Sequence, residues 1–247
     1  MIKLITLLIK FIVATIIALL FSSCVHTSMN FSDGIKGSGN MTTETRNVSQ
    51  DFTKIEVSNG IEVNIEQSNH KSITVETDDN LQKHIITKVE NGILKIEADE
   101  SYNTDETPVV NVKLPVINGL ETNGGSEITS QDVLITENII VKASSGSEIN
   151  IEVEADAIKI ESESGSHIEA SGKALKLDTY SASGSSIDAE NLMTNEIVAQ
   201  SESGSSISIY PILKLEANAS SGSSISYHKN PKTLSKEENS GGSVSEE

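Results

Sequence analysis

Six residues at one repeated position could carry acid–base chemistry if the fold brings them together. Each stands two places after a glycine of a recurring motif, and they are Glu127, Glu148, His167, Ser186, Ser206 and Ser224. A carboxylate beside an imidazole can exchange protons or bind a metal ion. The simpler interpretation is a solvated row in which the histidine relieves repulsion between carboxylates. We favour the solvated row, and therefore expect no catalytic residue, no metal site and no cofactor.

Other polar groups also have simpler explanations than a ligand site. Asp78-Asp79 and Asp105-Glu106 lack the spaced acidic pattern of a calcium loop. We interpret the first pair as a helix cap and the second as part of a solvent-exposed loop. The remaining histidines have no spacing typical of a metal site; they are His26, His70, His84 and His228. The Ser-Gly-Ser motifs could form a ligand-binding face, but serine and glycine are also the residues that tight turns need.

The elements that must position these residues form a repeat. Its glycines stand at positions 125, 146, 165, 184, 204, 222 and 241, so that successive copies are 21, 19, 19, 20, 18 and 19 residues apart. A near-constant period of this size indicates a solenoid, in which each unit buries its apolar face only against its neighbours. The last copy, Ser240-Gly241-Gly242-Ser243-Val244, is the most diverged.

Apolar residues alternate with polar ones on both sides of each glycine. The residues three places after it are Ile128, Ile149, Ile168, Ile187, Ile207 and Ile225, and those seven places before it are Ile139, Ile158, Leu177, Ile197 and Leu215. Alternation by two is the period of a strand, and helical spacing is absent. Stacked coils would align the isoleucines into a core column. The sequence therefore predicts an all-β, single-stranded parallel β-helix with coils of about 19–20 residues.

The repeated glycines are predicted to occupy the turns between strands. Six of them are assigned to such turns: Gly125, Gly146, Gly165, Gly184, Gly204 and Gly222. Glycine accepts positive φ at little steric cost, and the flanking serines can bond to nearby backbone groups.

The first 23 residues have the features of a bacterial lipoprotein signal peptide. Lys3 and Lys10 accompany an apolar run, and Ser22-Ser23 precede Cys24, the only cysteine of the chain. The stretch ending at Cys24 is similar to a lipobox, which predicts that Cys24 carries a lipid and anchors the protein in the cell envelope, with the outer membrane as the expected membrane. The alternatives are an ordinary cleaved signal with a stray cysteine, or an uncleaved membrane helix.

The rest of the chain divides into three parts. We predict a flexible tether over residues 24–45, the β-helix domain over 46–230 and a frayed polar tail over 231–247. Within the domain, residues 52–67 resemble a first coil with its turn at Ser58-Asn59-Gly60, and Asn91-Gly92 predicts a hairpin. A short helix is expected over residues 81–85.

The composition is strongly acidic and poor in aromatic residues. The chain has 36 acidic and 18 basic residues, a net charge of -18, and loss of residues 1–23 with their two lysines would make it about -20. This charge argues against binding nucleic acid or anionic lipid by electrostatic attraction. Because there is no Trp and only 3% of residues are aromatic, the core must be aliphatic.

Several motifs together resemble the putative auto-transporter adhesin, head GIN domain family. They are Phe52-Thr53-Lys54-Ile55, Asn59-Gly60-Ile61-Glu62-Val63, Val112-Lys113-Leu114-Pro115 and the Gly-Ser-x-Ile repeats, spanning roughly Val48 to Tyr227. The resemblance implies a right-handed single-stranded β-helix on a secreted or lipid-anchored bacterial protein. It does not imply an activity.

The leading functional hypothesis is a non-enzymatic, lipid-anchored envelope protein that presents an acidic, Ser-rich surface for binding or adhesion. Its expected partners are the membrane, through Cys24, and a surface glycan or protein, with no nucleic acid. The alternatives are a β-helix lyase or hydrolase acting on glycans, and a purely structural envelope protein. An enzyme would need converging carboxylates and aromatic platforms, and the chain has only four Tyr and four Phe.

Overall fold

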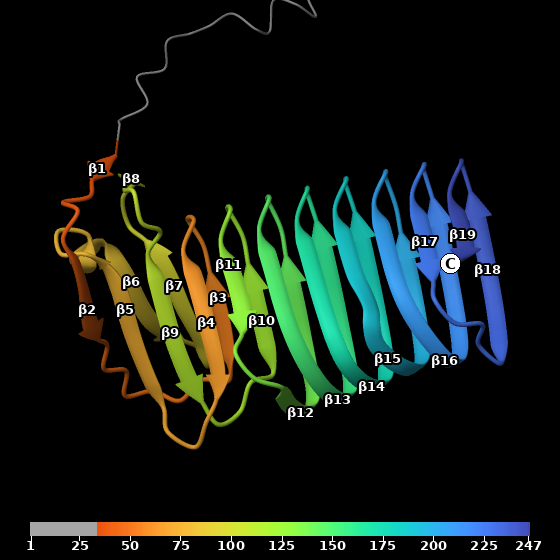
Figure 1. Ribbon diagram of the computed structural model, residues 1–247, viewed down its shortest axis with the longest axis horizontal. Helices are drawn as coiled ribbons and strands as arrows, with labels where there is room; N and C mark the ends of the chain where they lie inside the picture. The colour runs from red at the N-terminus through yellow and green to blue at the C-terminus, as the bar shows by residue number, and fades with distance from the viewer. Residues whose placement is uncertain (1–33) are drawn as a thin grey trace, which may run out of the picture. The chain divides into compact units, whose positions relative to one another are not determined.

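The computed structural model describes residues 34–247 and confirms the predicted β-solenoid. It has about 7 turns, with coils about 19 residues apart. The coils stack in a row, with the glycine turns along one edge and the curved middle of the long strands along the opposite edge (Figure 1). The predicted signal peptide, Cys24 and the first part of the tether lie outside the described residues.

Each repeating coil is made of the strands on either side of one glycine turn. In chain order the strands are β10 (Gly119–Thr122), β11 (Glu127–Ser130), β12 (Leu134–Ala143), β13 (Glu148–Glu163), β14 (His167–Ala182), β15 (Ser186–Ser201), β16 (Ser206–Ser220), β17 (Ser224–Tyr227), β18 (Thr233–Asn239) and β19 (Ser243–Glu246). Strands β13 to β16 run without a break from one turn to the next. All pairings among these ten strands are parallel.

The isoleucines three places after the glycines form the centre of the core. They are in register from coil to coil and at most 2% exposed: Ile128, Ile149, Ile168, Ile187, Ile207 and Ile225. The residues seven places before the glycines are buried to the same degree. Burying one such side chain contributes about 1.5–3 kcal/mol, so this column supplies much of the stability of the stack.

The turns need two consecutive residues with positive φ. Each repeat glycine has φ between 71° and 81°, and the residue before it also has positive φ, as in Ser164 at 55° and Ser183 at 57°. A positive φ at both central positions is the requirement of a type I′ turn, which joins twisted strands tightly. The turns are also linked to each other, because the Gly165 N–H donates to the Ser183 carbonyl of the next coil at 3.2 Å.

The turn geometry predicts a similar penalty for a β-branched residue at a middle and at the last turn. Gly184 has φ +71° and Gly241 has φ +81°, and an added Cβ would meet no atom within 4 Å at either. Only backbone strain therefore opposes Gly184→Val and Gly241→Val, and each should cost about 1–3 kcal/mol in urea unfolding. A silent Gly241→Val beside a costly Gly184→Val would show that the last turn does not hold its conformation.

The C-terminal segment is a further coil, so the prediction of a frayed tail over residues 231–247 is wrong. Its strands β18 and β19 pair with β16 and β17. Lys236 and Glu238 take the inward positions held by Ala217 and Ala219 one coil earlier. The Lys236 ammonium donates to the Val244 carbonyl at 3.0 Å, and the Glu238 carboxylate accepts from the Val244 N–H at 2.6 Å. Charged inward residues protect the open edge of the stack, as in the capping units of other repeat proteins.

The N-terminal end combines parallel and antiparallel strand pairings. The elements before the repeat are β1 (Ile35–Lys36), β2 (Met41–Thr45), β3 (Lys54–Val57), β4 (Glu62–Gln67), β5 (Ser72–Asp78), the 3₁₀ helix η1 (Gln82–His84), β6 (Ile85–Glu90), β7 (Ile93–Ala98), β8 (Tyr102–Asn103) and β9 (Val109–Leu114). Strand β2 pairs with β5, which corrects the tether prediction for residues 41–45. No helix in residues 34–247 has the length and apolar character of a membrane span.

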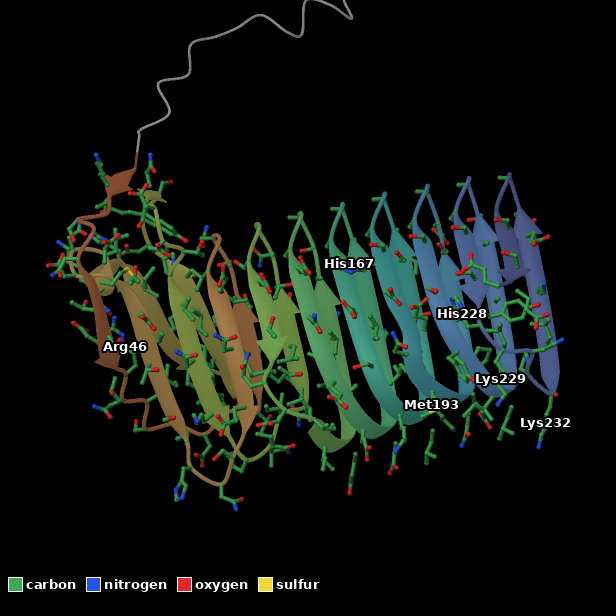
Figure 2. All side chains as sticks on the ribbon, viewed as in Figure 1. Arg46, His167, Met193, His228, Lys229 and Lys232 are labelled. Carbon is green, nitrogen blue, oxygen red and sulfur yellow. The ribbon has the colours of Figure 1, made fainter. Side chains whose placement is uncertain are left out.

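The stacking order at this end differs from the chain order. The predicted first coil, β3 and β4, lies directly against β10 and β11. Strands β7 and β9, which come later in the chain than β4, cover its other side. The hairpin at Asn91-Gly92 joins β6 to β7, as predicted. Arg46 supports this end by donating to the Gln82 backbone and side-chain oxygens at 2.6 and 2.8 Å (labelled in Figure 2).

Candidate functional site

The six candidate residues lie in one row along the stack. The row runs through Glu127, Glu148, His167, Ser186, Ser206 and Ser224 in register on neighbouring strands. It continues to Glu62 on one side and Ser243 on the other. The side chains point outward, because the isoleucine that follows each one in the repeat points inward. Figure 2 shows His167 near the turn edge of the solenoid.

Within this row the imidazole of His167 is hydrogen-bonded to a serine. The Nδ1 atom of His167 lies 2.7 Å from Ser186 Oγ, and no ion pair in residues 34–247 joins His167 to Glu148. Glu148 and His167 are therefore in register without forming an ion pair. Glu127 accepts a hydrogen bond from Thr129 Oγ1 at 3.1 Å, within its own strand. The polar groups of this row thus bond to hydroxyls.

A second outward row lies beside the first, two residues further along each strand. Its members are Thr129, Asn150, Glu169, Asp188, Ser208 and Ser226. We call the two rows together the acidic face. Neither row contains a lysine or an arginine, and in the described part of the chain no ion pair involves Glu127, Glu148, Glu169 or Asp188. The acidic face therefore carries uncompensated negative charge beside short hydroxyl and amide groups.

The other outward face, formed by the strands that precede the turns, contains lysines that pair with carboxylates. Lys142 and Lys159 both contact the Glu161 carboxylate, at 2.5 and 2.7 Å, and their hydrogen bonds lower the pKa of Glu161. On a later coil Lys214 contacts Glu216 at 2.6 Å. We call this surface the paired face. The two faces therefore differ in that lysines pair with carboxylates on the paired face, whereas the rows of the acidic face contain no lysine.

His228 is the centre of a polar cluster that the histidine spacing did not predict. Its Nε2 lies 2.9 Å from Ser208 Oγ, 3.2 Å from Glu190 Oε2 and 3.6 Å from Glu247 Oε2. Activating a serine through histidine requires the acid on the other ring nitrogen, so this arrangement is not a catalytic triad. The sequence feature that could have predicted this cluster is the position of His228, two residues after Ser226, which lies on the acidic face.

The serines directly after the turn glycines are structural. They are at most 3% exposed: Ser126, Ser147, Ser166, Ser185, Ser205 and Ser223. Ser185 Oγ, for example, lies 2.6 Å from the Ser162 carbonyl of the preceding coil and accepts from the Ala182 N–H at 3.1 Å. These hydroxyls connect neighbouring coils and are buried, so they form no ligand-binding face. The turn interpretation of the Ser-Gly-Ser motifs holds for them.

Asp78 and Asp79 fix the entry of the chain into the solenoid. Asp78 accepts from the Gly39 N–H at 2.7 Å and from Thr104 Oγ1 at 2.6 Å, and no side chain caps η1. The helix-cap interpretation is therefore wrong. Hydrogen bonds from Ser38 and Asn40 lower the pKa of Asp79. Within residues 34–247, no group of three or more His, Cys, Asp or Glu side chains is arranged to hold a metal ion.

Together these features define the class of the protein: a β-solenoid that presents an acidic face without lysine and a second face where lysines pair with carboxylates. The chain belongs to the family described as "Putative auto-transporter adhesin, head GIN domain", whose model matches residues 51–231. A comparison with curated proteins gave no match.

Solved bacterial structures share this fold. A putative adhesin from Bacteroides fragilis is 20% identical with a TM-score of 0.80, covering 86% of this chain and 100% of its own. A putative lipid binding protein from Parabacteroides distasonis is 21% identical with a TM-score of 0.72, covering 86% and 99%. A putative adhesin from Parabacteroides merdae is 18% identical with a TM-score of 0.70, covering 86% and 98%.

Proposed function

We propose that this protein is a non-enzymatic binding module of the cell envelope, anchored by a lipid on Cys24, whose acidic face takes a surface glycan. The observation that carries the proposal is the pair of outward rows on the acidic face. Hydroxyl, amide and carboxylate groups recur there at the spacing of adjacent strands, about 4.8 Å. Such groups donate to and accept from the hydroxyls of a sugar. A flat row repeated over several coils suits an extended chain more than a small ligand.

The position of the anchor follows from the sequence. Cys24 is the only cysteine, and it follows an apolar run and Ser22-Ser23, as the lipid-accepting cysteine of a lipoprotein signal does. A lipid at Cys24 would tether the chain to a membrane. We propose the outer membrane as that membrane.

Changing Cys24 to serine should release the protein from the membrane, because the thiol that accepts the lipid is lost. The measurement is membrane fractionation of cells producing the Cys24→Ser chain and the unchanged chain. Ser23→Ala is the control, because it keeps the cysteine and should leave the protein in the membrane fraction. Retention of Cys24→Ser in that fraction would show that another segment holds the protein.

A lysine on the acidic face should weaken glycan binding, whereas the same change on the paired face should not. Asn150 and Asn218 are both exposed asparagines on strands, the first on the acidic face and the second on the paired face. On a glycan array, Asn150→Lys should lower the affinity for each glycan that the unchanged chain binds by about tenfold, because hydrogen bonds are lost and the lysine side chain conflicts sterically with the ligand. Asn218→Lys is expected to bind like the unchanged chain.

The same array separates the proposal from its alternatives. Equal binding by both lysine variants would place the ligand elsewhere. Shortened glycan products after incubation would indicate a lyase or hydrolase. Absence of glycan binding by the unchanged chain, with envelope integrity depending on its presence, would favour a purely structural protein.

A further inference from the structure

A groove runs across the coils at the edge opposite the glycine turns. It has a volume of about 670 Å³ and includes one apolar side chain from each of five coils: Ile135, Ala155, Leu175, Met193 and Ile212. We call it the corner groove. Figure 2 shows Met193 at this edge, away from the turns. The groove is separate from the acidic face, whose rows lie closer to the turns.

The apolar side chains of the corner groove are unusually exposed. Ile135 is 66% exposed, Leu175 51% and Met193 42%. Leaving such side chains in water forgoes the stabilisation that burial would give. Along most of β13, by contrast, apolar residues point inward and polar residues point outward. An exposed apolar strip rimmed by polar residues is typical of a surface that another molecule covers.

The regular ladder is interrupted at the same edge. The register shifts between Glu169 and Gly172 in the β14–β15 pairing, and between Ala189 and Met193 and again between Thr194 and Glu196 in the β15–β16 pairing. Bulges of this kind redirect side chains and are common beside functional sites. The β15–β16 shifts lie on both sides of Met193, and the β14–β15 shift ends three residues before Leu175. The groove therefore overlaps a local departure from the repeat.

The charges of the groove indicate what would cover it. Glu154 and Lys173 form a pair at 3.4 Å, whereas Glu137 and Asp156, which also line the groove, make no ion pair within residues 34–247. Two uncompensated carboxylates beside an apolar strip favour an occupant that is both apolar and cationic. A second copy of this chain, with a net charge of -18, and an anionic lipid surface would both be repelled.

We infer that the corner groove binds a segment of another polypeptide in which apolar side chains alternate with lysine or arginine. The apolar side chains pack on Leu175, Met193 and Ile135, and the cationic side chains approach Glu137 and Asp156. The interaction requires neither the glycan nor the lipid anchor, so it stands whether or not the proposed function does.

The test is binding of a short fluorescent peptide of alternating leucine and lysine to the mature chain, followed by fluorescence anisotropy. The unchanged chain should bind it, and Leu175→Ser with Met193→Ser should bind at least about tenfold more weakly, because two apolar anchors are lost. Glu137→Gln with Asp156→Asn should weaken binding and reduce its dependence on salt. The matched control is Ile140→Ser with Val198→Ser, two residues of the paired face that are 41% and 38% exposed and lie outside the groove.

Other outcomes would overturn the inference. One is no binding by the unchanged chain. Another is that Leu175→Ser with Met193→Ser binds as tightly as the unchanged chain, or that the Ile140→Ser with Val198→Ser control loses as much affinity as the groove variant. A third is equal binding of peptides with glutamate in place of lysine or serine in place of leucine. If sedimentation showed that the unchanged chain is a dimer and that Leu175→Ser with Met193→Ser makes it a monomer, the groove would be assigned to a second copy. Binding to vesicles of anionic lipid that these two changes abolish would assign it to a membrane.

Discussion

Replacing Ile168 by aspartate should remove most of the stability of the solenoid. Ile168 is fully buried and lies in register between Ile149 and Ile187. An aspartate there would place a carboxylate in an aliphatic column that offers it no cation, and the loss of stability should be on the order of 4 kcal/mol. Urea unfolding of Ile168→Asp beside the unchanged chain measures it directly.

The loss should depend on pH in a way that identifies its cause. Burial raises the pKa of an aspartic acid carboxyl, so the penalty is fully present above that raised pKa and shrinks as the pH falls through it. Asn150→Asp provides the control, because it adds the same charge at an exposed position of the neighbouring coil and should change stability by less than about 0.5 kcal/mol. Similar losses for the two variants would mean that the inward and outward assignments are wrong.

The repeating part of the fold could be predicted because two simple signals agree. The two-residue alternation fixes which side chains face inward, and the glycines fix where the chain turns. Ile149 and Gly146 show both signals within one motif, since the first is fully buried and the second has φ +72°. The same logic identified the coil at Asn59-Gly60, where the residues of the turn differ but both φ values are positive.

The two ends could not be predicted, because they depend on what lies beside each strand. Lys236 and Glu238 interrupt the inward pattern, and the sequence alone presents this as decay of the repeat. Within residues 34–247 no coil covers these positions on their outer side, so charged residues there are solvated and protect the edge. At the other end, β7 and β9 stack outside β3 and β4, an order that local patterns do not encode.

Each candidate site could be predicted only as far as it follows the repeat. The first row of the acidic face follows directly from the glycine period, because parallel coils in register align equal positions. The corner groove does not, since the register shifts around Met193 break that correspondence. His228 likewise meets Glu190 and Ser208 from the two coils before its own, although no spacing between histidines indicates this cluster. Periodicity therefore predicts rows of side chains, whereas irregular positions require coordinates.

Gly172 is one such irregular position, and replacing it by alanine should be severely destabilising. It lies inside β14 rather than in a turn, beside the Glu169–Gly172 register shift, with φ +114°. A Cβ there would lie 2.2 Å from the Val153 carbonyl oxygen of the preceding coil. An alanine with this positive φ should cost about 1–3 kcal/mol in backbone strain. Moving Val153 away from the new Cβ should cost about another 1–3 kcal/mol, the usual penalty for overpacking a buried site. The sequence feature that could have predicted this close backbone contact is a single glycine within a strand pattern.

Gly165→Ala separates these two contributions for Gly172→Ala. Gly165 also has positive φ, at +73°, but an added Cβ there would meet nothing within 4 Å. Its substitution should therefore cost only the backbone strain, about 1–2 kcal/mol, and the difference between the two variants measures the contact with Val153. Denaturant unfolding of both gives that difference. If Gly172→Ala were no worse than Gly165→Ala, the backbones of β13 and β14 would not approach so closely at Val153.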